Sequence, residues 1–244
     1  MKNKINAKII TLLNFELDKK YEILDLGCGS GLLLETIKNG VGNGSKLIGL
    51  DSDAKTIEQA KKSYPDIDFI HDKFIDSFNF PDESFDYILS VDTLECIPNK
   101  TSFVNEICRV LKKEGQILFA HWDWDTQVYN SINKAVIRKF VAAFSDWQQG
   151  WMDACDGQMG RKLWGIFQGS GLFDGRMDIF SLNEMEYTEG QYGYDRLQDL
   201  YSLVKKGQLD KKEYKMVLDE MKALKSKDEY FYSLNSYIFT GKKA

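Results

Sequence analysis

The chain has 244 residues and a net charge of −5, with 43% hydrophobic and 28% charged residues. This composition is ordinary for a globular protein and excludes extensive disorder. The acidic balance argues against a broad nucleic-acid-binding face, although it leaves room for a local basic patch. No apolar run approaches a membrane span and no signal-peptide core opens the chain, so we expect a soluble, cytoplasmic protein.

Cysteine and histidine usage argues against disulfides and against a metal centre. The cysteines, at positions 28, 96, 108 and 155, are widely spaced and form no close pair. This spacing predicts free thiols in a reducing compartment. Cys96 has no evident basic neighbour, so we expect a buried and unreactive thiol. Only two histidines occur in the chain, and we therefore expect no metal site.

Strands and helices are predicted to alternate through the first half of the chain. Parallel strands need long crossovers, so this order predicts a parallel sheet with helices on its faces. In chain order we expect a helix over 3–17, a strand over 21–26, a helix after Gly31, a strand over 46–50, a helix capped by Ser52 or Asp53, strands over 68–71 and 85–91, a helix through 103–111, a turn at 114–115 and a strand over 116–121.

The second half is less regular. We find no internal repeat and no linker, so we expect a single domain over residues 1–244 with a cofactor-binding half over 20–125. The expected elements are helices over 126–145 and 159–170, a strand over 176–187, helices over 195–206 and 210–225, and a closing strand over 235–240.

The central motif is the glycine-rich run over residues 23–31. Gly27, Gly29 and Gly31 permit a tight strand-to-helix turn and a close approach of a ligand to the backbone. The helix behind them points free N–H groups at that ligand, which favours an anionic group such as the carboxylate of a methionine moiety. The alternative is that these glycines serve only a structural turn.

Two acids follow the next two strands. Asp51 ends the second strand, where a carboxylate can accept two hydrogen bonds from a ribose diol. Asp72 ends the third strand and could meet an adenine amino group. Both positions line the carboxyl edge of one sheet, where open α/β folds bind ligands. Alternatively, Asp51 is a helix cap or a solvated acid, and Asp72 is an ordinary loop acid.

The motif over residues 25–31, Asp-Leu-Gly-Cys-Gly-Ser-Gly, resembles the first motif of class I S-adenosylmethionine-dependent methyltransferases. Asp51 matches their ribose-binding acid, and residues 85–88 resemble their fourth-strand motif. Residues 111–117 resemble the turn before their fifth strand, with Lys-Glu in place of the usual proline-glycine. The resemblance is strong over about residues 20–121, weak over 160–241, and nearest to ubiquinone and menaquinone methyltransferases.

The resemblance implies a Rossmann-like α/β fold with a seven-stranded, mostly parallel sheet whose last strand is antiparallel. It also implies S-adenosylmethionine as the methyl donor and S-adenosylhomocysteine as the product. The residues that we expect to line the donor site are Asp25, Gly27, Cys28, Gly29, Gly31, Asp51, Ser52, Asp72, Lys73, Phe74 and Val91.

A dinucleotide oxidoreductase is the nearest competing interpretation of the glycine-rich turn. Its fingerprint spaces the glycines as GxGxxG, whereas here they stand at 27, 29 and 31 and position 32 is leucine. Asp25 lies two residues before the first glycine. A carboxylate there suits a cationic amino-acid moiety and would repel a pyrophosphate.

Methyl transfer from a sulfonium mainly requires alignment of nucleophile, methyl carbon and sulfur, and a base is needed only for a protonated acceptor. His121 ends the fifth strand beside Asp123 and Asp125, so it is the candidate base. Trp122 and Trp124 could hold a flat or cationic substrate. The alternative is that this segment packs a loop with its acids facing water.

Further candidate substrate contacts follow the fourth strand and precede the charged helices. Asp92 and Glu95 should lie near the transferred methyl group, unless they only begin a helix or loop. Tyr192 and Tyr194 belong to a glycine- and tyrosine-rich run. Residues 188–232 could form a helical lid over the substrate, or their helices could simply bury apolar side chains against the core.

We therefore predict transfer of a methyl group from S-adenosylmethionine to a small molecule. RNA or protein methylation is the first alternative, disfavoured because the fourth strand leads into Ser-Val-Asp-Thr and not into the Asn-Pro-Pro-Tyr motif of amide and adenine methylators. A non-catalytic donor-binding scaffold is the second. The acceptor atom and the oligomeric state are left open.

Overall fold

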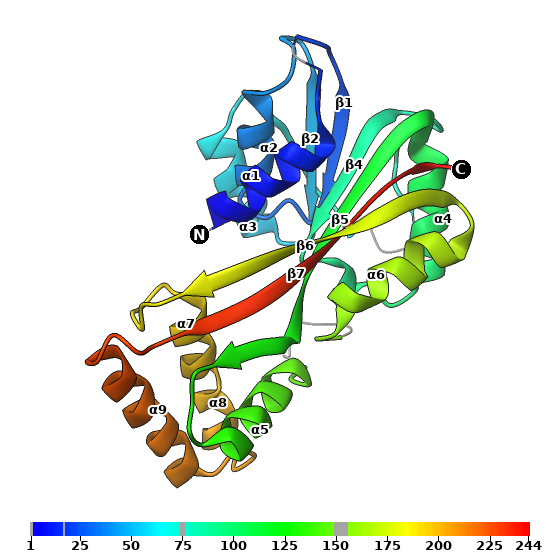
Figure 1. The fold of residues 1–244 in the computed structure, drawn as a ribbon. Helices are drawn as coiled ribbons and strands as arrows, with labels where there is room; N and C mark the ends of the chain where they lie inside the picture. Colours follow the sequence, from blue (N-terminus) through cyan, green and yellow to red (C-terminus); the bar gives the residue numbers. More distant parts are fainter. Residues whose placement is uncertain (1, 17, 74–76, 149–155) are drawn as a thin grey trace. The chain divides into compact units, whose positions relative to one another are not determined.

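A computed structural model describes residues 2–16, 18–73, 77–148 and 156–244 (Figure 1). The predicted alternation of helices and strands is present through the first half. Its elements are α1 (Lys2–Leu13), β1 (Glu22–Leu26), α2 (Leu32–Lys38), β2 (Lys46–Asp51), α3 (Ala54–Ser63), β3 (Asp68–His71), β4 (Phe85–Val91), the 3₁₀ turn η1 (Leu94–Cys96), α4 (Lys100–Val110) and β5 (Leu111–Tyr129).

The second half supplies helices and two long strands. Gly171, with φ 71°, ends the 3₁₀ turn η2 in the left-handed region, as expected for a glycine stop. The elements are α5 (Lys134–Ser145), α6 (Met159–Phe167), η2 (Gln168–Ser170), β6 (Phe173–Glu184), α7 (Tyr192–Asp199), α8 (Tyr201–Lys205), α9 (Lys211–Lys225) and β7 (Tyr232–Lys243).

The strands form one seven-stranded sheet in the order β3-β2-β1-β4-β5-β7-β6, with β7 antiparallel. Strand β1 pairs in parallel with β2 and with β4, so it lies at the centre of the parallel part. In register, Asp25 stands opposite Gly49 on one side and Leu89 on the other. The parallel strands therefore end together, and the residues that follow them share one edge.

The chain divides into two compact units. Unit 1 comprises residues 1–121, 159–178 and 237–244, and unit 2 comprises residues 122–158 and 179–236. Strands β5, β6 and β7 contribute residues to both units. The lid predicted over residues 188–232 falls within unit 2, and its role stays a prediction.

Unit 1 has a core on each face of its parallel strands. One face carries a continuous apolar cluster in which residues of β1, β2, β4 and β5 pack with α4 and α6. Phe103, Ile107 and Val110 of α4 are almost wholly buried there. Figure 1 shows α1, α2 and α3 together on the other side of β1 and β2. Side chains alternate along a strand, so Asp25, between Leu24 and Leu26 of that cluster, belongs to the α1–α3 side.

Unit 2 buries its own apolar side chains. Two of its carboxylates accept hydrogen bonds at the start of a helix or just ahead of it. Both Glu184 oxygens accept backbone N–H bonds at the start of α7, from Tyr192 and Gly193 at 2.9 Å. Glu220 of α9 accepts bonds from Ser131 and Ile132 ahead of α5, at 2.8 and 2.7 Å. The Glu184 bonds supply acceptors for N–H groups that a helix end leaves open, whereas the Glu220 bonds hold the segment just ahead of α5.

Strand β5 corrects two sequence predictions. The expected turn at 114–115 lies inside β5, where the register shifts so that residues 112–115 stand opposite Asp86 alone. Such an insertion is a bulge, which bends a strand without ending it. The strand also continues to Tyr129, so residues 122–125 are not a loop and 126–129 are not helical. The aromatic residues of this segment favour a half-buried strand.

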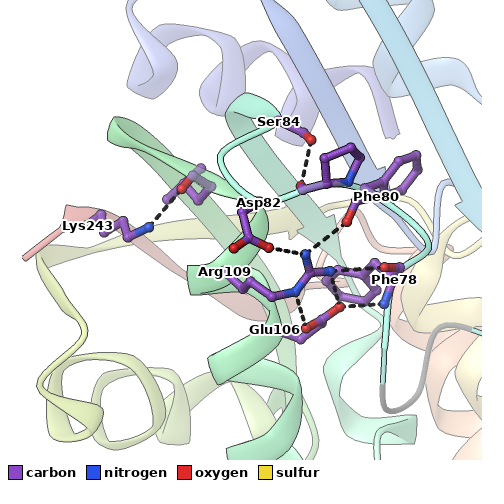
Figure 2. Close-up of polar contacts among 9 residues, drawn as sticks. Phe78, Phe80, Asp82, Ser84, Glu106, Arg109 and Lys243 are labelled. Carbon is purple, nitrogen blue, oxygen red and sulfur yellow. Dashed lines mark hydrogen bonds and ion pairs between the residues drawn. The ribbon is translucent and has the colours of Figure 1, made fainter.

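The segment that precedes β4 is fixed by one arginine of α4 (Figure 2). The Arg109 guanidinium donates to Glu106 at 2.6 and 2.8 Å and to Asp82 at 2.6 Å. It also donates to the carbonyls of Phe78 and Phe80 at 3.1 and 2.9 Å. Two carboxylates and two carbonyls around one guanidinium use its rigid fork of donors and tie residues 78–82 to α4.

Cys28, Cys96 and Cys108 are free thiols, as predicted, whereas Cys155 lies outside the described residues. Among the helices that the structure describes, none is both long enough and apolar enough to cross a membrane.

Candidate functional site

The glycine-rich turn between β1 and α2 depends on backbone conformations that other residues rarely adopt. Gly27, Gly29 and Gly31 have φ angles of 76°, 52° and 78°. The N–H groups of Gly27 and Cys28 both donate to the carbonyl of Leu50, at 2.8 and 2.9 Å, which ties the turn to the end of β2. The turn is therefore held open and in place by backbone geometry that glycine supplies at little cost.

The three glycines differ in what surrounds them. A side chain at Gly27 would overlap Thr93, with 2.0 Å to its Oγ1, and one at Gly31 would overlap Phe69 at 2.4 Å. A side chain at Gly29 would meet nothing within 4 Å. Gly27 and Gly31 thus allow tight internal packing, while Gly29 presents bare backbone to open space. This is the cradle that a ligand lying against the turn requires, so the turn fits the donor implied by the resemblance.

Asp51 at the end of β2 shapes the turn and also faces the site. Its Oδ2 accepts a bond from Gly29 N at 2.9 Å, and its Oδ1 accepts one from Asp53 N at 2.9 Å. Each carboxylate oxygen has a second lone pair, so both oxygens can still accept from a diol. The helix-cap alternative for Asp51 does not hold, because Asp53 is the N-cap of α3 and accepts from Thr56.

Asp25 is a buried acid beneath the turn, with 2% of its surface exposed. Burial, reinforced by the negative charge of Asp51, raises the pKa of Asp25 to about 7. A cation placed against the turn would favour the ionised form of this carboxyl. The same surroundings raise the pKa of the Cys28 thiol far above its usual range, first through burial and then through the charges of Asp25 and Asp51. Cys28 therefore stays protonated and serves packing.

Four of the other predicted donor-site residues, Ser52, Asp72, Lys73 and Val91, lie at the same edge of the sheet. Asp72 follows β3, and its N–H donates to the carbonyl of Asp51 at 3.1 Å. Ser52 follows Asp51 and is exposed, and its carbonyl lies 3.1 Å from His71 Nε2. The remaining three are Lys73, which is exposed, Val91, which is half-buried at the end of β4, and Phe74, which lies outside the described residues.

The end of β4 and the middle of β5 bring His121, Asp92 and Glu95 together. Asp92 N donates to the carbonyl of Ala120 at 2.9 Å, which places Asp92 beside His121. Asp92 Oδ1 lies 3.5 Å from His121 Nδ1, and Asp92 has a left-handed φ of 61°. The sequence pointed to Asp123 and Asp125 as the acids beside His121. The acid that the structure places beside His121 is Asp92, which follows β4, and β4 pairs in parallel with β5.

The same three side chains have metal-ligand chemistry. One donor atom from each of Asp92, Glu95 and His121 lies within 4.8 Å of the other two. His121 and Glu95 are 1% and 8% exposed, while Asp92 is open to solvent. An imidazole and two carboxylates can act on a protonated substrate or share a divalent cation. The trio is thus a polar cluster beside the end of β4, the strand that pairs with β1 before the donor turn.

In unit 2, three of the predicted substrate residues form an aromatic cluster. The Trp122 ring lies 6.3 Å from Trp124 and 5.3 Å from Tyr192, and Trp124 lies 6.4 Å from Tyr192. Tyr194 does not join these contacts and packs instead on Tyr187, at 4.9 Å. Trp122 and Trp124 are only 4% and 9% exposed and Tyr192 is half-buried, so in this structure the three rings pack against one another inside unit 2.

Sequence reasoning missed Arg196, which the fold brings to this aromatic cluster. Its guanidinium lies 5.7 Å from the Trp124 ring centre and 5.6 Å from that of Tyr192, and it pairs with Asp199 at 2.9 Å. The sequence offers no signal for this contact, because Arg196 and Trp124 are far apart along the chain. Sequence reasoning also missed Thr93, whose packing against Gly27 depends on the pairing of β1 with β4.

Comparisons with known proteins agree with this geometry. A family model described as a methyltransferase domain matches residues 17–171. A ubiquinone biosynthesis O-methyltransferase of Klebsiella pneumoniae is 27% identical over 103 residues, which cover 41% of each chain. A demethylmenaquinone methyltransferase of Bacillus licheniformis is 30% identical over 118 residues, covering 47% of this chain and 50% of the relative. The chain thus spans half or less of the length of these relatives.

Solved structures share the fold along nearly the whole chain. A Bacillus halodurans protein named as a methyltransferase superposes with a TM-score of 0.63 at 17% identity, covering 98% of both chains. The phosphoethanolamine N-methyltransferase 2 of Haemonchus contortus, in complex with S-adenosylhomocysteine, gives a TM-score of 0.54 at 15% identity. It covers 98% of this chain and 52% of that one. At these identities the likeness establishes the fold alone.

Proposed function

Since the chain belongs to the class I S-adenosylmethionine-dependent methyltransferases, we propose that it transfers the methyl group to a small molecule. The family implies S-adenosylmethionine as the donor. The glycine turn, with open space over Gly29, would hold its amino-acid part. Asp51 would accept bonds from its ribose and Asp72 would meet its adenine. The donor's sulfonium supplies the methyl group, and the chain's own residues bind and orient it.

The observation that carries the small-molecule assignment is the burial of the cluster formed by His121, Glu95 and Asp92. Two of these three side chains are almost fully buried, and only Asp92 opens to solvent. A small molecule is the acceptor best able to reach buried groups, whereas a group on a folded protein or a base in a duplex would first have to be pulled out of its surroundings. Relatives named for ubiquinone and menaquinone biosynthesis support the same class of acceptor.

The chemistry proposed at this cluster of His121, Glu95 and Asp92 is alignment of the acceptor with the methyl group, assisted by proton removal. An acceptor that already carries a free lone pair needs only to be held in line with the methyl carbon. For a hydroxyl acceptor, we propose that His121 takes the proton while Asp92 faces the opposite ring nitrogen. Trp122, Trp124 and Tyr192 belong to unit 2, and their role as substrate contacts stays a prediction.

A turnover assay with radiolabelled donor tests the proposal. The purified chain is incubated separately with phenols and hydroxyquinones, with small amines, with total RNA and with denatured protein. Label is expected in the small-molecule fraction only. Label in RNA or protein would contradict the acceptor class. Donor binding without label in any fraction would point to a scaffold that binds the donor.

The role of His121 is tested with the acceptor that the assay identifies. His121→Asn should lower the single-turnover rate by about 10²–10⁴-fold with little change in donor affinity. His71→Asn, which changes the other histidine, is the control for loss of an imidazole and should keep the single-turnover rate at saturating donor; its donor affinity is measured separately, because His71 Nε2 lies 3.1 Å from the carbonyl of Ser52. A wild-type rate in His121→Asn would remove this residue from the mechanism. Loss of activity on adding EDTA, restored by Mn²⁺, would show that the reaction needs a divalent cation, which Asp92, Glu95 and His121 could hold.

A further inference from the structure

Unit 2 contains a pocket that the methyltransferase assignment does not use. Its volume is about 730 Å³, which is in the range that small organic ligands occupy. The pocket is lined by the end of β5 and the two residues after it, by α5 as far as Val141, and by Phe231, and all the lining residues belong to unit 2.

Part of the pocket wall is apolar. Val128, Ile137, Val141 and Phe231 all contribute side chains to it. Ile137 is buried, whereas Val128 is 52% exposed although it is a large aliphatic residue at the end of a strand. Apolar surface left in contact with water inside a concavity favours a ligand with an apolar part that covers it.

Two cations line the same pocket. Lys134 and Arg138 are one helical turn apart on α5, so they project from the same side of the helix. Among the described residues neither has an acidic partner, whereas Lys139 on the same helix pairs with Glu213 at 2.8 Å. The first turn of α5 also carries no acidic residue. In a chain of net charge −5, these two cations are a local basic site.

Asp125 is the one acid among the described lining residues, and its Oδ2 accepts a bond from Gln158 Nε2 at 3.4 Å. Two cations against one carboxylate leave the lining with a net positive charge. The pocket therefore combines an apolar wall with a side that carries net positive charge. That combination is complementary to a molecule with an anionic head and an apolar chain.

We propose that this pocket binds an anionic amphiphile, with its carboxylate on Lys134 and Arg138 and its alkyl chain over Val128, Val141 and Phe231. The proposal goes beyond methyl transfer and does not depend on it, because binding can be measured without donor or acceptor. The ligand is a single molecule held inside the pocket, and a membrane surface is a separate outcome of the test.

Titration calorimetry with dodecanoate, below its micelle concentration, tests the proposal on the full chain. We expect one saturable site per chain and clearly weaker binding of dodecanol, which lacks the charge. The double variant Lys134→Gln, Arg138→Gln should weaken dodecanoate binding by about tenfold to a hundredfold, because it removes two charged hydrogen-bond donors. Lys139→Gln removes a neighbouring lysine that is already paired, and it should bind like the wild type.

A second variant tests the apolar wall. Val141→Trp should fill the pocket and abolish dodecanoate binding, with thermal unfolding followed in parallel to show that the variant is folded. Dodecanoate binding that is absent in the wild type, or unchanged in the double variant, would overturn the proposal. Binding to vesicles of equal parts phosphatidylcholine and phosphatidylglycerol, without binding of free dodecanoate, would also overturn it and would indicate a membrane-facing surface.

Discussion

Replacing Asp25 with asparagine should remove a pH dependence from donor binding. In the free protein the pKa of Asp25 is about 7, because burial and the charge of Asp51 disfavour its ionised form. The amino-acid part of the donor carries a cationic ammonium, which favours the ionised form. If only that form binds well, affinity should rise with pH and level off above about 7. Between pH 8 and pH 6 the expected loss is about tenfold.

The stability of the free protein should change in the opposite direction. A folded-state pKa of about 7, against 3.8 for the ordinary aspartate, means that the folded chain holds this proton more tightly than the unfolded chain does. The contribution of Asp25 to stability is therefore complete below pH 3.8 and is lost as pH rises through 7. The shift corresponds to a free energy on the order of 4 kcal/mol. Asp25→Asn should remove this loss and be the more stable variant at pH 8.

Calorimetric donor titrations of wild type and Asp25→Asn at several pH values measure the first effect, and urea unfolding at the same pH values measures the second. The variant also serves as the control, because any pH dependence of the donor's own ammonium appears in both proteins. A pH profile of donor affinity that is the same in both would refute the argument from the buried carboxyl.

The remaining predictions concern Asp51, the glycines of the turn, and Arg109, which holds the segment before β4. Asp51→Ala should weaken donor binding by about tenfold to about a hundredfold in calorimetry, and an unchanged dissociation constant would leave Asp51 with only a structural role. Gly31→Ala should lower stability by about 1–3 kcal/mol, because its left-handed φ and the Phe69 ring leave no room. Gly29→Ala, which faces open space, should cost about 1 kcal/mol in stability yet impair donor binding; the reverse order in urea unfolding would contradict this contrast. Arg109→Leu should lower unfolding stability by about 2–4 kcal/mol by leaving its carboxylate and carbonyl partners unpaired, and a near-wild-type melting temperature would show that water replaces it.

Local sequence was sufficient for most elements of unit 1 and for the donor turn. Strands β3 and β4 have the predicted bounds, because short apolar runs between turn residues predict buried strands. The turn was recognisable because its glycine spacing, its strand and the acid after the next strand are all local features. The α/β class followed from the alternation of strands and helices, and S-adenosylmethionine was implied by the family resemblance of the turn.

Predictions from local sequence were wrong where contacts between distant segments determine the structure. The extent of β5 depends on its strand partners and on the bulge opposite Asp86, which no local pattern encodes, so the predicted turn and loop were wrong. The acid beside His121 is Asp92 for the same reason: the two are 29 positions apart in sequence, and only the parallel pairing of β4 with β5 brings them within 3.5 Å. Tertiary structure also created the contact of Arg196 with Trp124 and the pocket beside α5, because both join surfaces of elements that are separate in the chain. Sequence thus determined which side chains with useful chemistry exist and how strands and helices alternate in the first half, and packing decided the extent of the later elements and which side chains meet.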